Sequence, residues 1–234
     1  MSTLFTATRL HAFYGATHVL HGIDLTIRKG ETVALMGRNG MGKTTLLRSL
    51  MGLMPQTRGR ILLGERDVTG APPESIAQGG VAFVPEGRGI FASLTVIENL
   101  VMAARPGRDG AWTLDRVLAL FPRLAERRRN WGNQLSGGEQ QMLTIGRALM
   151  TNPDLILIDE ATEGLAPMIA ESIWTTLRTI RGQGVATLVV DKDFRALSRL
   201  ADRVLLMTKG ELVFDGTPAA LQETPELLEK HLGI

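Results

Sequence analysis

Short apolar runs alternate along the chain with segments whose apolar residues recur at helical spacing. Apolar residues dominate the runs at residues 32–36, 80–85, 154–159, 185–190 and 203–207. Such runs are typical of strands that are buried on both faces of a parallel sheet. Between them, the segment 168–180 carries one apolar helical side, with Ile169, Ile173, Leu177 and Ile180. The alternation predicts an α/β fold with a mostly parallel central sheet.

The start and the middle of the chain follow other patterns. The opening segment predicts strands at residues 4–10, 19–27 and 32–36, the first two in an antiparallel arrangement. Residues 95–130 have a mainly helical pattern, and residues 217–231 predict a terminal helix or two. An antiparallel start and a helical middle favour two lobes within one chain.

Composition narrows the possible functions. The chain has 234 residues and is 44% hydrophobic, which suits one large domain, or one core with a smaller insert. The net charge of +2 is too small to indicate a nucleic-acid-binding protein. The absence of cysteine excludes disulfides, thiolate metal sites and cysteine nucleophiles. With no signal-peptide pattern and no apolar stretch of about 18 residues, we expect a cytosolic chain that can still dock on a membrane protein.

A glycine-rich segment after the run at 32–36 matches the phosphate-binding pattern G-x-x-x-x-G-K-[ST]. Its glycines let backbone N–H groups surround phosphates, and the following helix adds a favourable dipole. Lys43 is expected to reach the β- and γ-phosphates, and the Thr44 hydroxyl to ligate Mg²⁺. The alternative is a glycine-rich turn that binds nothing. The predicted nucleotide-binding residues here are Gly37, Arg38, Asn39, Gly40, Met41, Gly42, Lys43, Thr44 and Thr45.

Two acidic residues follow the apolar run at 154–159. Asp159 and Glu160 should emerge at the carboxyl end of the sheet, where open α/β folds bind ligands. Beside a phosphate loop, Asp159 suits the Mg²⁺ shell and Glu160 suits orienting the attacking water. The alternative is an ordinary charged loop after a strand.

The segment LSGGEQQMLTIGRALM, at residues 135–150, predicts a helix that begins at Ser136, with Glu139 in its first turn. The glycines Gly137 and Gly138 at this helix start make a second anion site conceivable. Two phosphate-binding helix starts are more than a single nucleotide needs, and the alternative is a capped helix that binds nothing.

The phosphate loop, the LSGGE segment and the apolar Asp-Glu strand, in this order, resemble the ATP-binding cassette of ABC transporters over essentially the whole chain. This resemblance implies an ATPase that uses ATP and Mg²⁺. It implies a P-loop NTPase core with an antiparallel β subdomain over residues 1–85 and 155–234, and a helical subdomain over about 86–154. It also implies that two cassettes pair head to tail, each ATP lying between one phosphate loop and the other chain's Ser136, Gly137, Gly138 and Glu139.

Further positions match the family. Tyr14 corresponds to the aromatic residue that stacks on adenine, although a half-buried core tyrosine is the alternative. Residues 163–167, EGLAP, correspond to the loop that touches the other cassette. Glu86 lies where most cassettes have a glutamine that contacts Mg²⁺ and water, so we expect it among the metal ligands with Thr44 and Asp159. An ordinary loop acid is the alternative for Glu86.

A narrower resemblance follows from VPEGR at residues 84–88 and from EGLAP, which are similar to one cassette of branched-chain amino-acid importers. It implies a second cassette, two integral membrane permease subunits and a periplasmic or lipid-anchored binding protein, with the chain on the cytoplasmic face of the inner membrane. A coupling helix of the permease is expected near residues 86–105. Urea, amides and aromatic acids remain open as solutes. The basic tract with Arg123, Arg127, Arg128 and Arg129 could face a partner or lipid, but a solvated helical face is favoured.

Rival functions are a soluble ABC ATPase of DNA repair or translation, an exporter cassette, and a weakly hydrolysing regulatory partner. The first generally needs long inserts or two fused cassettes, and the second usually carries glutamine at position 86. The departures from the family at positions 86 and 192 keep the third open, although the intact Lys43, Asp159 and Glu160 argue against complete loss of hydrolysis. Ala161 replaces the usual proline after Asp-Glu, which makes the placement of Glu160 less certain. Lys192 replaces the usual histidine that senses the γ-phosphate.

Lys192 is the middle of three consecutive charged residues, 191–193, which directly follow an apolar run. The branched-chain group is expected to read VEQN here, so a missing histidine is normal for it but a lysine is not. A lysine keeps a donor and a positive charge but cannot act as a neutral acceptor. Our hypothesis is a catalytic contact from Lys192 to the γ-phosphate, with Asp191 and Asp193 at the subunit interface. A surface lysine neutralised by its two neighbours is the alternative.

Overall fold

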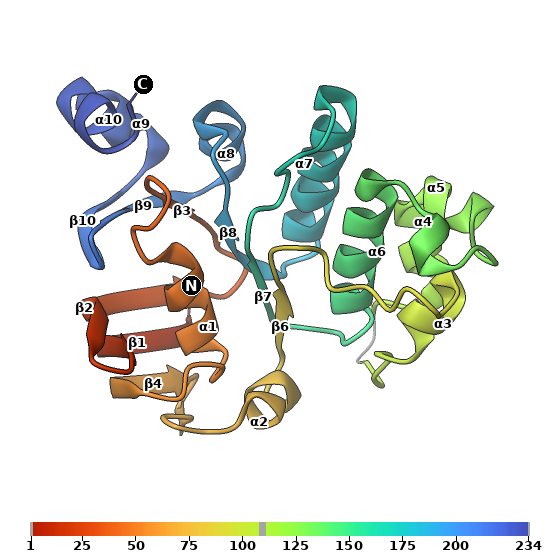
Figure 1. The fold of residues 1–234 in the computed structure, drawn as a ribbon, viewed down its shortest axis with the longest axis horizontal. Coiled ribbons are helices and arrows are strands. Elements are labelled where there is room, and N and C mark those ends of the chain that lie inside the picture. The colour runs from red at the N-terminus through yellow and green to blue at the C-terminus, as the bar shows by residue number, and fades with distance from the viewer. Residues whose placement is uncertain (1, 108–110, 234) are drawn as a thin grey trace.

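Two β-sheets and the helices around them make up the computed structural model, which describes residues 2–107 and 111–233 (Figure 1). The large sheet has the strand order β10-β9-β3-β8-β7-β6. Its neighbouring strands are parallel except for the antiparallel pair β9–β10. The strands are β3 (Thr32–Met36), β6 (Val81–Val84), β7 (Leu155–Ile158), β8 (Ala186–Val190), β9 (Arg203–Thr208) and β10 (Glu211–Gly216). The predicted mostly parallel sheet is confirmed.

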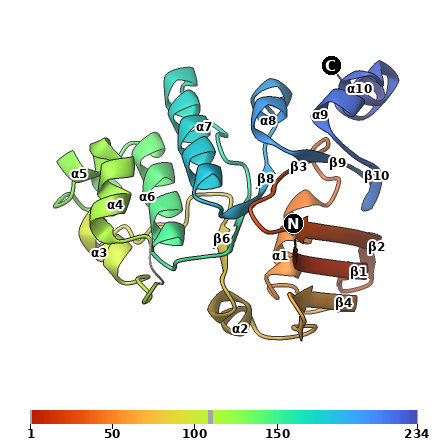
Figure 2. The same cartoon turned by 180° about the vertical axis from the view of Figure 1, so that it is seen from behind.

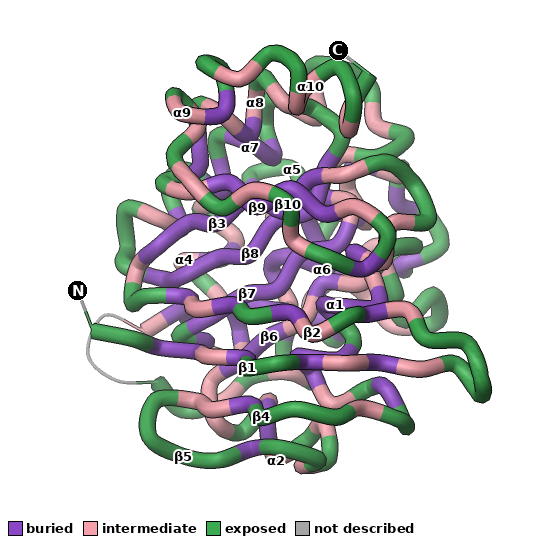
Figure 3. The backbone as a smooth tube through the Cα atoms, turned by 90° about the vertical axis from the view of Figure 1, so that its left-hand side faces the viewer, coloured by how far each residue is buried: buried purple, intermediate pink, exposed green. Residues whose placement is uncertain are grey.

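The five parallel strands of the large sheet are mostly buried on both faces, which explains why β3, β6, β7, β8 and β9 are continuous apolar runs. Ala34 and Met36 on one face pack into a cluster with the helices α6 to α8, whereas Val33 and Leu35 on the other face pack with α1 and the small sheet. Successive residues of a strand point to opposite faces, so one run serves two cores. Figure 3 shows β3, β7 and β8 buried through most of their length.

The small sheet is antiparallel and has the order β2-β1-β4-β5. Its strands are β1 (Thr3–Tyr14), β2 (Thr17–Arg28), β4 (Thr57–Leu63) and β5 (Arg66–Asp67). Phe5 and Leu10 of β1 are fully buried, whereas Thr8 and Tyr14 of the same strand are exposed. One face therefore covers the core, and the antiparallel start predicted from the sequence is confirmed.

The helices differ in which part of the molecule they build. They are α1 (Lys43–Leu50), α2 (Pro73–Gln78), α3 (Val96–Val101), α4 (Leu114–Leu120), α5 (Pro122–Glu126), α6 (Gly137–Leu149), α7 (Pro167–Gly182), α8 (Phe194–Leu200), α9 (Pro218–Gln222) and α10 (Pro225–His231). A short 3-10 turn, Gly132–Gln134, precedes α6. Helices α3 to α6 gather beyond β6, away from the small sheet (Figures 1 and 2).

The helical group α3 to α6 falls within the predicted helical subdomain of about residues 86–154, but the exact division of the chain stays a prediction. Among the described residues, no helix combines the length and the apolar character that a bilayer crossing would require. The parallel sheet, the antiparallel small sheet and the separate helical group agree with the fold class expected from the motifs.

Candidate functional site

The site lies at the carboxyl end of the parallel strands, where β3, β6 and β7 each continue into a loop with polar residues. These loops border a cavity of about 310 Å³. Its lining residues are Val19, Asn39, Gly40, Gly42, Lys43, Thr44, Thr45, Glu86 and Glu160. The fold therefore brings the phosphate loop together with Glu86 and Glu160, as the sequence predicts.

The phosphate loop joins β3 to α1 in a backbone path that requires glycine. Gly37 has a φ of 147°, and a Cβ atom added there would lie 2.4 Å from the Met207 carbonyl oxygen. Gly42, with a φ of 103°, precedes the first residue of α1. The loop curves around the Lys43 ammonium, which donates hydrogen bonds to the carbonyl oxygens of Gly37 at 2.7 Å and Arg38 at 2.9 Å.

The Lys43 ammonium is buried without a carboxylate in direct contact among the described residues. Burial lowers the pKa of Lys43, the charge of Asp159 opposes that change, and the charge of Lys192 adds to it. A phosphate group in the loop would favour the charged ammonium, because an opposite charge nearby stabilises the ionised form. The loop is thus poised for an anion.

Asp159 follows β7 and is only 1% exposed. Neither of its carboxylate oxygens has a hydrogen-bond partner among the described residues. Burial raises the pKa of Asp159 and Glu86 raises it further, whereas the Thr44 hydroxyl and the Lys43 charge oppose the rise. Buried carboxylates without partners are costly, and carboxylate, hydroxyl and water oxygens are ligands that Mg²⁺ accepts. The residues present therefore fit a Mg²⁺ ion near Asp159, Thr44 and Glu86.

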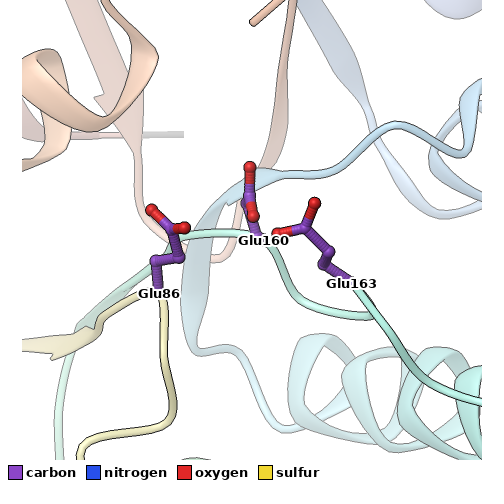
Figure 4. Close-up of side chains that lie close together, drawn as sticks. All are labelled: Glu86, Glu160 and Glu163. Atoms are coloured by element: carbon purple, nitrogen blue, oxygen red, sulfur yellow. The ribbon is translucent and has the colours of Figure 1, made fainter.

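Glu160 adopts a left-handed backbone conformation, with a φ of 53°. Its Oε2 atom is buried without a hydrogen-bond partner among the described residues. A non-glycine residue at positive φ costs free energy, and such residues gather at functional sites. Carboxylate oxygens of Glu86, Glu160 and Glu163 lie within 4.8 Å of one another, from the loops after β6 and β7 (Figure 4). One of the three, Glu163, is matched by the Lys192 ammonium.

Ala161, where the family has proline, contributes to the placement of Glu160. Its N–H group donates a hydrogen bond to the Val190 carbonyl oxygen at 3.2 Å. A proline could not make this bond because it lacks the N–H group. The chain thus replaces a fixed backbone angle with a hydrogen bond that ties the loop after β7 to the end of β8.

The loop that carries Glu86 is held against α6 by residues that the sequence analysis does not single out. Arg147 of α6 donates to the Gly89 carbonyl oxygen at 2.6 Å, and its guanidinium lies 5.1 Å from the Phe91 ring centroid. The Thr144 hydroxyl of α6 donates to the Arg88 carbonyl oxygen. The spacing of Thr144 and Arg147, about one turn apart on the LSGGE helix, is the only sequence signal for this role.

The start of α6 is built as the LSGGE pattern predicts. The Ser136 hydroxyl accepts from the Glu139 N–H at 3.4 Å, and the Glu139 carboxylate accepts from the Ser136 N–H at 2.8 Å. A Cβ atom on Gly138 would lie 2.4 Å from Ile169, and one on Gly137 would lie 2.7 Å from the Arg88 guanidinium. Glu139 thus has a structural role as a helix cap, alongside its predicted role toward nucleotide.

Ser136 and the two glycines do not line the cavity at the phosphate loop. The helix α6 lies on the other side of β6 and β7 from α1, in both views of the molecule (Figures 1 and 2). Ser136 is exposed. The two predicted anion sites of the chain are therefore separate in space.

Tyr14 and Lys192 complete the predicted set. Tyr14 ends β1, with two residues between it and β2, and is 46% exposed. The Lys192 ammonium pairs with the Glu163 carboxylate, and this hydrogen bond raises the pKa of Lys192. Asp191 accepts from the Thr162 N–H and hydroxyl, each at 2.8 Å, and Asp193 accepts from the Ala196 N–H at 2.9 Å at the start of α8. Both acids thus have partners within the chain.

Comparisons with known proteins agree with this geometry. The family model described as ABC transporter matches residues 20–163. The high-affinity branched-chain amino acid transport ATP-binding protein BraG of Pseudomonas aeruginosa is 40% identical over 227 residues, or 96% of this chain and 97% of BraG. The lipopolysaccharide export system ATP-binding protein LptB of Escherichia coli is 31% identical over 237 residues, or 100% of this chain and 98% of LptB.

Solved structures share the fold. A crystal structure of a nucleotide-free ATP-binding cassette from an ABC transporter has a TM-score of 0.84 and 23% sequence identity. The likeness covers 97% of this chain and 98% of that one. It therefore extends over both sheets and the helical group α3 to α6.

Proposed function

Since the chain belongs to the ABC transporter family of ATP-binding cassettes, we propose that it energises the import of branched-chain or related amino acids. The chain is an ATP-binding, ATP-hydrolysing enzyme, as its family and its fold indicate. The likeness to BraG over 96% of the chain carries the proposal of the transported solute. The VPEGR and EGLAP patterns support the same group.

The phosphate loop binds ATP in this proposal. Lys43 would exchange its two backbone acceptors, the Gly37 and Arg38 carbonyl oxygens, for oxygens of the β- and γ-phosphates. The exposed Tyr14 ring would stack on adenine. Thr44, Asp159 and Glu86 would hold Mg²⁺, which would neutralise charge on the phosphates.

Glu160 is the proposed catalytic carboxylate. It lines the cavity beside Lys43, and its unpartnered Oε2 atom can accept a hydrogen bond from a water molecule. The water oxygen attacks the γ-phosphorus, and the bond from this phosphorus to the β–γ bridging oxygen breaks. Glu160 orients the water and takes up its proton, leaving ADP and inorganic phosphate as the products.

A second cassette would complete each site. The Ser136 end of α6 lies apart from the chain's own phosphate loop, which supports a head-to-tail pair that joins the two anion sites across an interface. The pair could be formed with a second copy or with a different cassette.

Two permease subunits would contact the helical group next to Glu86. Phe91, Met102 and Trp131 are large apolar side chains that are 46%, 53% and 51% exposed. Phe91 follows the loop that Arg147 ties to α6, so a permease helix docked there could move both. This arrangement would hold the chain at the cytoplasmic face of the inner membrane, with the binding protein on the opposite side.

The basic tract contributes little to that docking. Arg123 pairs with Glu126 at 3.3 Å and Arg127 lies 3.8 Å from Glu139, so two of its charges are matched within the chain. These pairs support the solvated face that the sequence analysis favours.

Transport in a reconstituted system tests the solute. The experiment places this chain, its partner cassette, both permease subunits and the binding protein in proteoliposomes with internal ATP. Uptake of labelled leucine, isoleucine or valine supports the proposal. Uptake of urea, amides or aromatic acids instead would show that the proposed solute is wrong but that the chain still serves an importer.

Lipopolysaccharide export is the second candidate, because LptB is 31% identical over the whole chain. ATP-dependent extraction of lipopolysaccharide from the same vesicles would favour it over import. A weakly hydrolysing regulatory partner is the third candidate. Lys43 and Glu160 line one cavity, and the charge of Lys43 acts on Asp159, which together argue against this candidate.

A further inference from the structure

The loops after β7 and β8 are joined by three successive contacts. The strands β7 and β8 are parallel neighbours, and their loops continue side by side. Ala161 contacts Val190 through a backbone hydrogen bond, and Thr162 contacts Asp191 through two hydrogen bonds of 2.8 Å. Glu163 then contacts Lys192 through an ion pair. Each contact lies one residue further along both loops, so they form a short ladder.

The third contact differs from the other two in how easily it can open. The first two involve main-chain N–H groups, and Asp191 is only 8% exposed. The Lys192 and Glu163 side chains are 52% and 44% exposed, and neither contributes its main chain to the contact. The Glu163–Lys192 pair can therefore separate by side-chain rotation while the rest of the ladder stays in place.

Lys192 lies within electrostatic reach of the nucleotide site. Its charge lowers the pKa of Lys43, and Glu86 acts on Lys192 in turn. Lys192, Glu163 and Glu160 line one cavity of about 370 Å³ next to the phosphate-loop cavity, and Glu160 lines both. An anion bound beside Lys43 and Glu160 would thus compete with Glu163 for the Lys192 ammonium.

We propose that Glu163 and Lys192 form an ion pair that the γ-phosphate of ATP opens. The proposal rests on the proposed function, because it requires ATP in the phosphate loop. Without nucleotide, Lys192 pairs with Glu163. With ATP, the ammonium turns to the γ-phosphate, and Glu163 is released in the EGLAP loop that would face the second cassette. ADP lacks the γ-phosphate and leaves the pair closed.

Because Glu163 and the γ-phosphate compete for Lys192, replacing Glu163 and replacing Lys192 should change the affinity for ATP in opposite directions. Glu163→Gln removes the competitor, so binding of a non-hydrolysable ATP analogue should tighten by about threefold, the scale of an exposed ion pair. Lys192→Ala removes the ammonium, so binding of the same analogue should weaken by about tenfold, as for a charge-assisted hydrogen bond. Neither variant should change the affinity for ADP.

Titration calorimetry of the purified chain with Mg²⁺ and either nucleotide tests the proposal. Glu171→Gln is the matched control, because it removes one carboxylate from another exposed ion pair, the one with Arg178 at 2.6 Å. The ratio of analogue to ADP affinity should rise for Glu163→Gln, fall for Lys192→Ala and stay unchanged for Glu171→Gln. An unchanged ratio for Glu163→Gln, or equal changes for both nucleotides, would overturn the ion-pair exchange.

Lys43→Ala separates this outcome from failure of the proposed function. If Lys43→Ala loses both nucleotides while the Glu163 and Lys192 variants behave like the control, only the exchange is wrong. If Lys43→Ala binds both nucleotides like the parental chain, the phosphate-loop site itself is wrong, and the exchange falls with it.

Discussion

Replacing Asp159 with asparagine should stabilise the protein without nucleotide and destabilise its complex with Mg²⁺ and ATP. Asp159 is 1% exposed, and both of its oxygens lack hydrogen-bond partners among the described residues. An unsatisfied buried polar group costs about 1–3 kcal/mol, and a charged one costs more. Asparagine keeps the shape but removes the charge.

The expected gain is the difference between these costs, reduced by the lost attraction of the carboxylate to the Thr44 hydroxyl and to Lys43. We expect the free energy of unfolding to rise by about 1 kcal/mol. For a chain of this size, such a change raises Tm by about 2–4 °C. Mg²⁺ and ATP at a hundred times their Kd should stabilise the parental protein by about 2.7 kcal/mol, and the variant should lose most of this gain. The order of the two Tm values should therefore reverse when Mg²⁺ and ATP are added.

The pH dependence of the gain has a defined sign. Burial raises the pKa of Asp159 above its usual 3.8, so the folded state binds this proton more tightly than the unfolded state. The contribution of Asp159 to stability is therefore most favourable at low pH and is lost as pH rises through the raised pKa. The advantage of Asp159→Asn should be small in acid and should grow as pH rises through the raised pKa.

Thermal unfolding with EDTA, and again with Mg²⁺ and ATP, measures both effects. Asp154→Asn is the control, because Asp154 is exposed and directly precedes β7, whereas Asp159 directly follows it. Its Tm should change little under either condition. A lower Tm for Asp159→Asn in EDTA would refute the reasoning, because it would mean that the carboxylate is stabilising without metal.

Variants at three further positions test the other parts of the site. Lys43→Ala should weaken ATP binding at least a hundredfold in calorimetry, because it removes a buried cation at the densest phosphate charge; unchanged affinity would contradict the phosphate-loop assignment. Tyr14→Ala should weaken ATP binding by about 1–3 kcal/mol through lost base stacking, whereas Tyr14→Phe should bind like the parental protein. Equal losses in both would show that the ring does not stack on adenine. Ser136→Arg should leave ATP binding by the isolated chain intact but abolish hydrolysis by the assembled pair, so loss of intrinsic binding would argue against the head-to-tail arrangement.

The sequence was most informative about features that a short stretch of residues determines by itself. The buried runs predicted the parallel strands, because a strand covered on both faces must be apolar throughout. The phosphate loop and Asp159 followed from their position after such strands, and the structure gathers Glu86 and Glu160 around the same cavity. The edge strand β10 was missed, because its residues alternate between exposed and half-buried positions.

Contacts between distant loops could not be predicted from the sequence. Glu163 and Lys192 are 29 residues apart, and their pairing depends on the register of β7 and β8. The hydrogen bond from Ala161 to Val190 depends on the same register. Glu139 was predicted both in the first turn of this helix and at nucleotide, and the structure shows it in the first of these places. Sequence motifs thus identified the residues that carry the chemistry, whereas the contacts that position these residues are visible only in the folded structure.

Single-turnover hydrolysis of ATP with Mg²⁺ by the purified protein, alone and with its partner cassette, tests the central claim most directly. The parental protein should release phosphate, whereas Glu160→Gln should bind ATP, release almost none and accumulate as a closed pair in size-exclusion chromatography. If Glu160→Gln released phosphate at the parental rate, Glu160 would not be the catalytic carboxylate. If the parental protein bound ATP but released no phosphate even with its partner, the chain would not be the hydrolysing subunit.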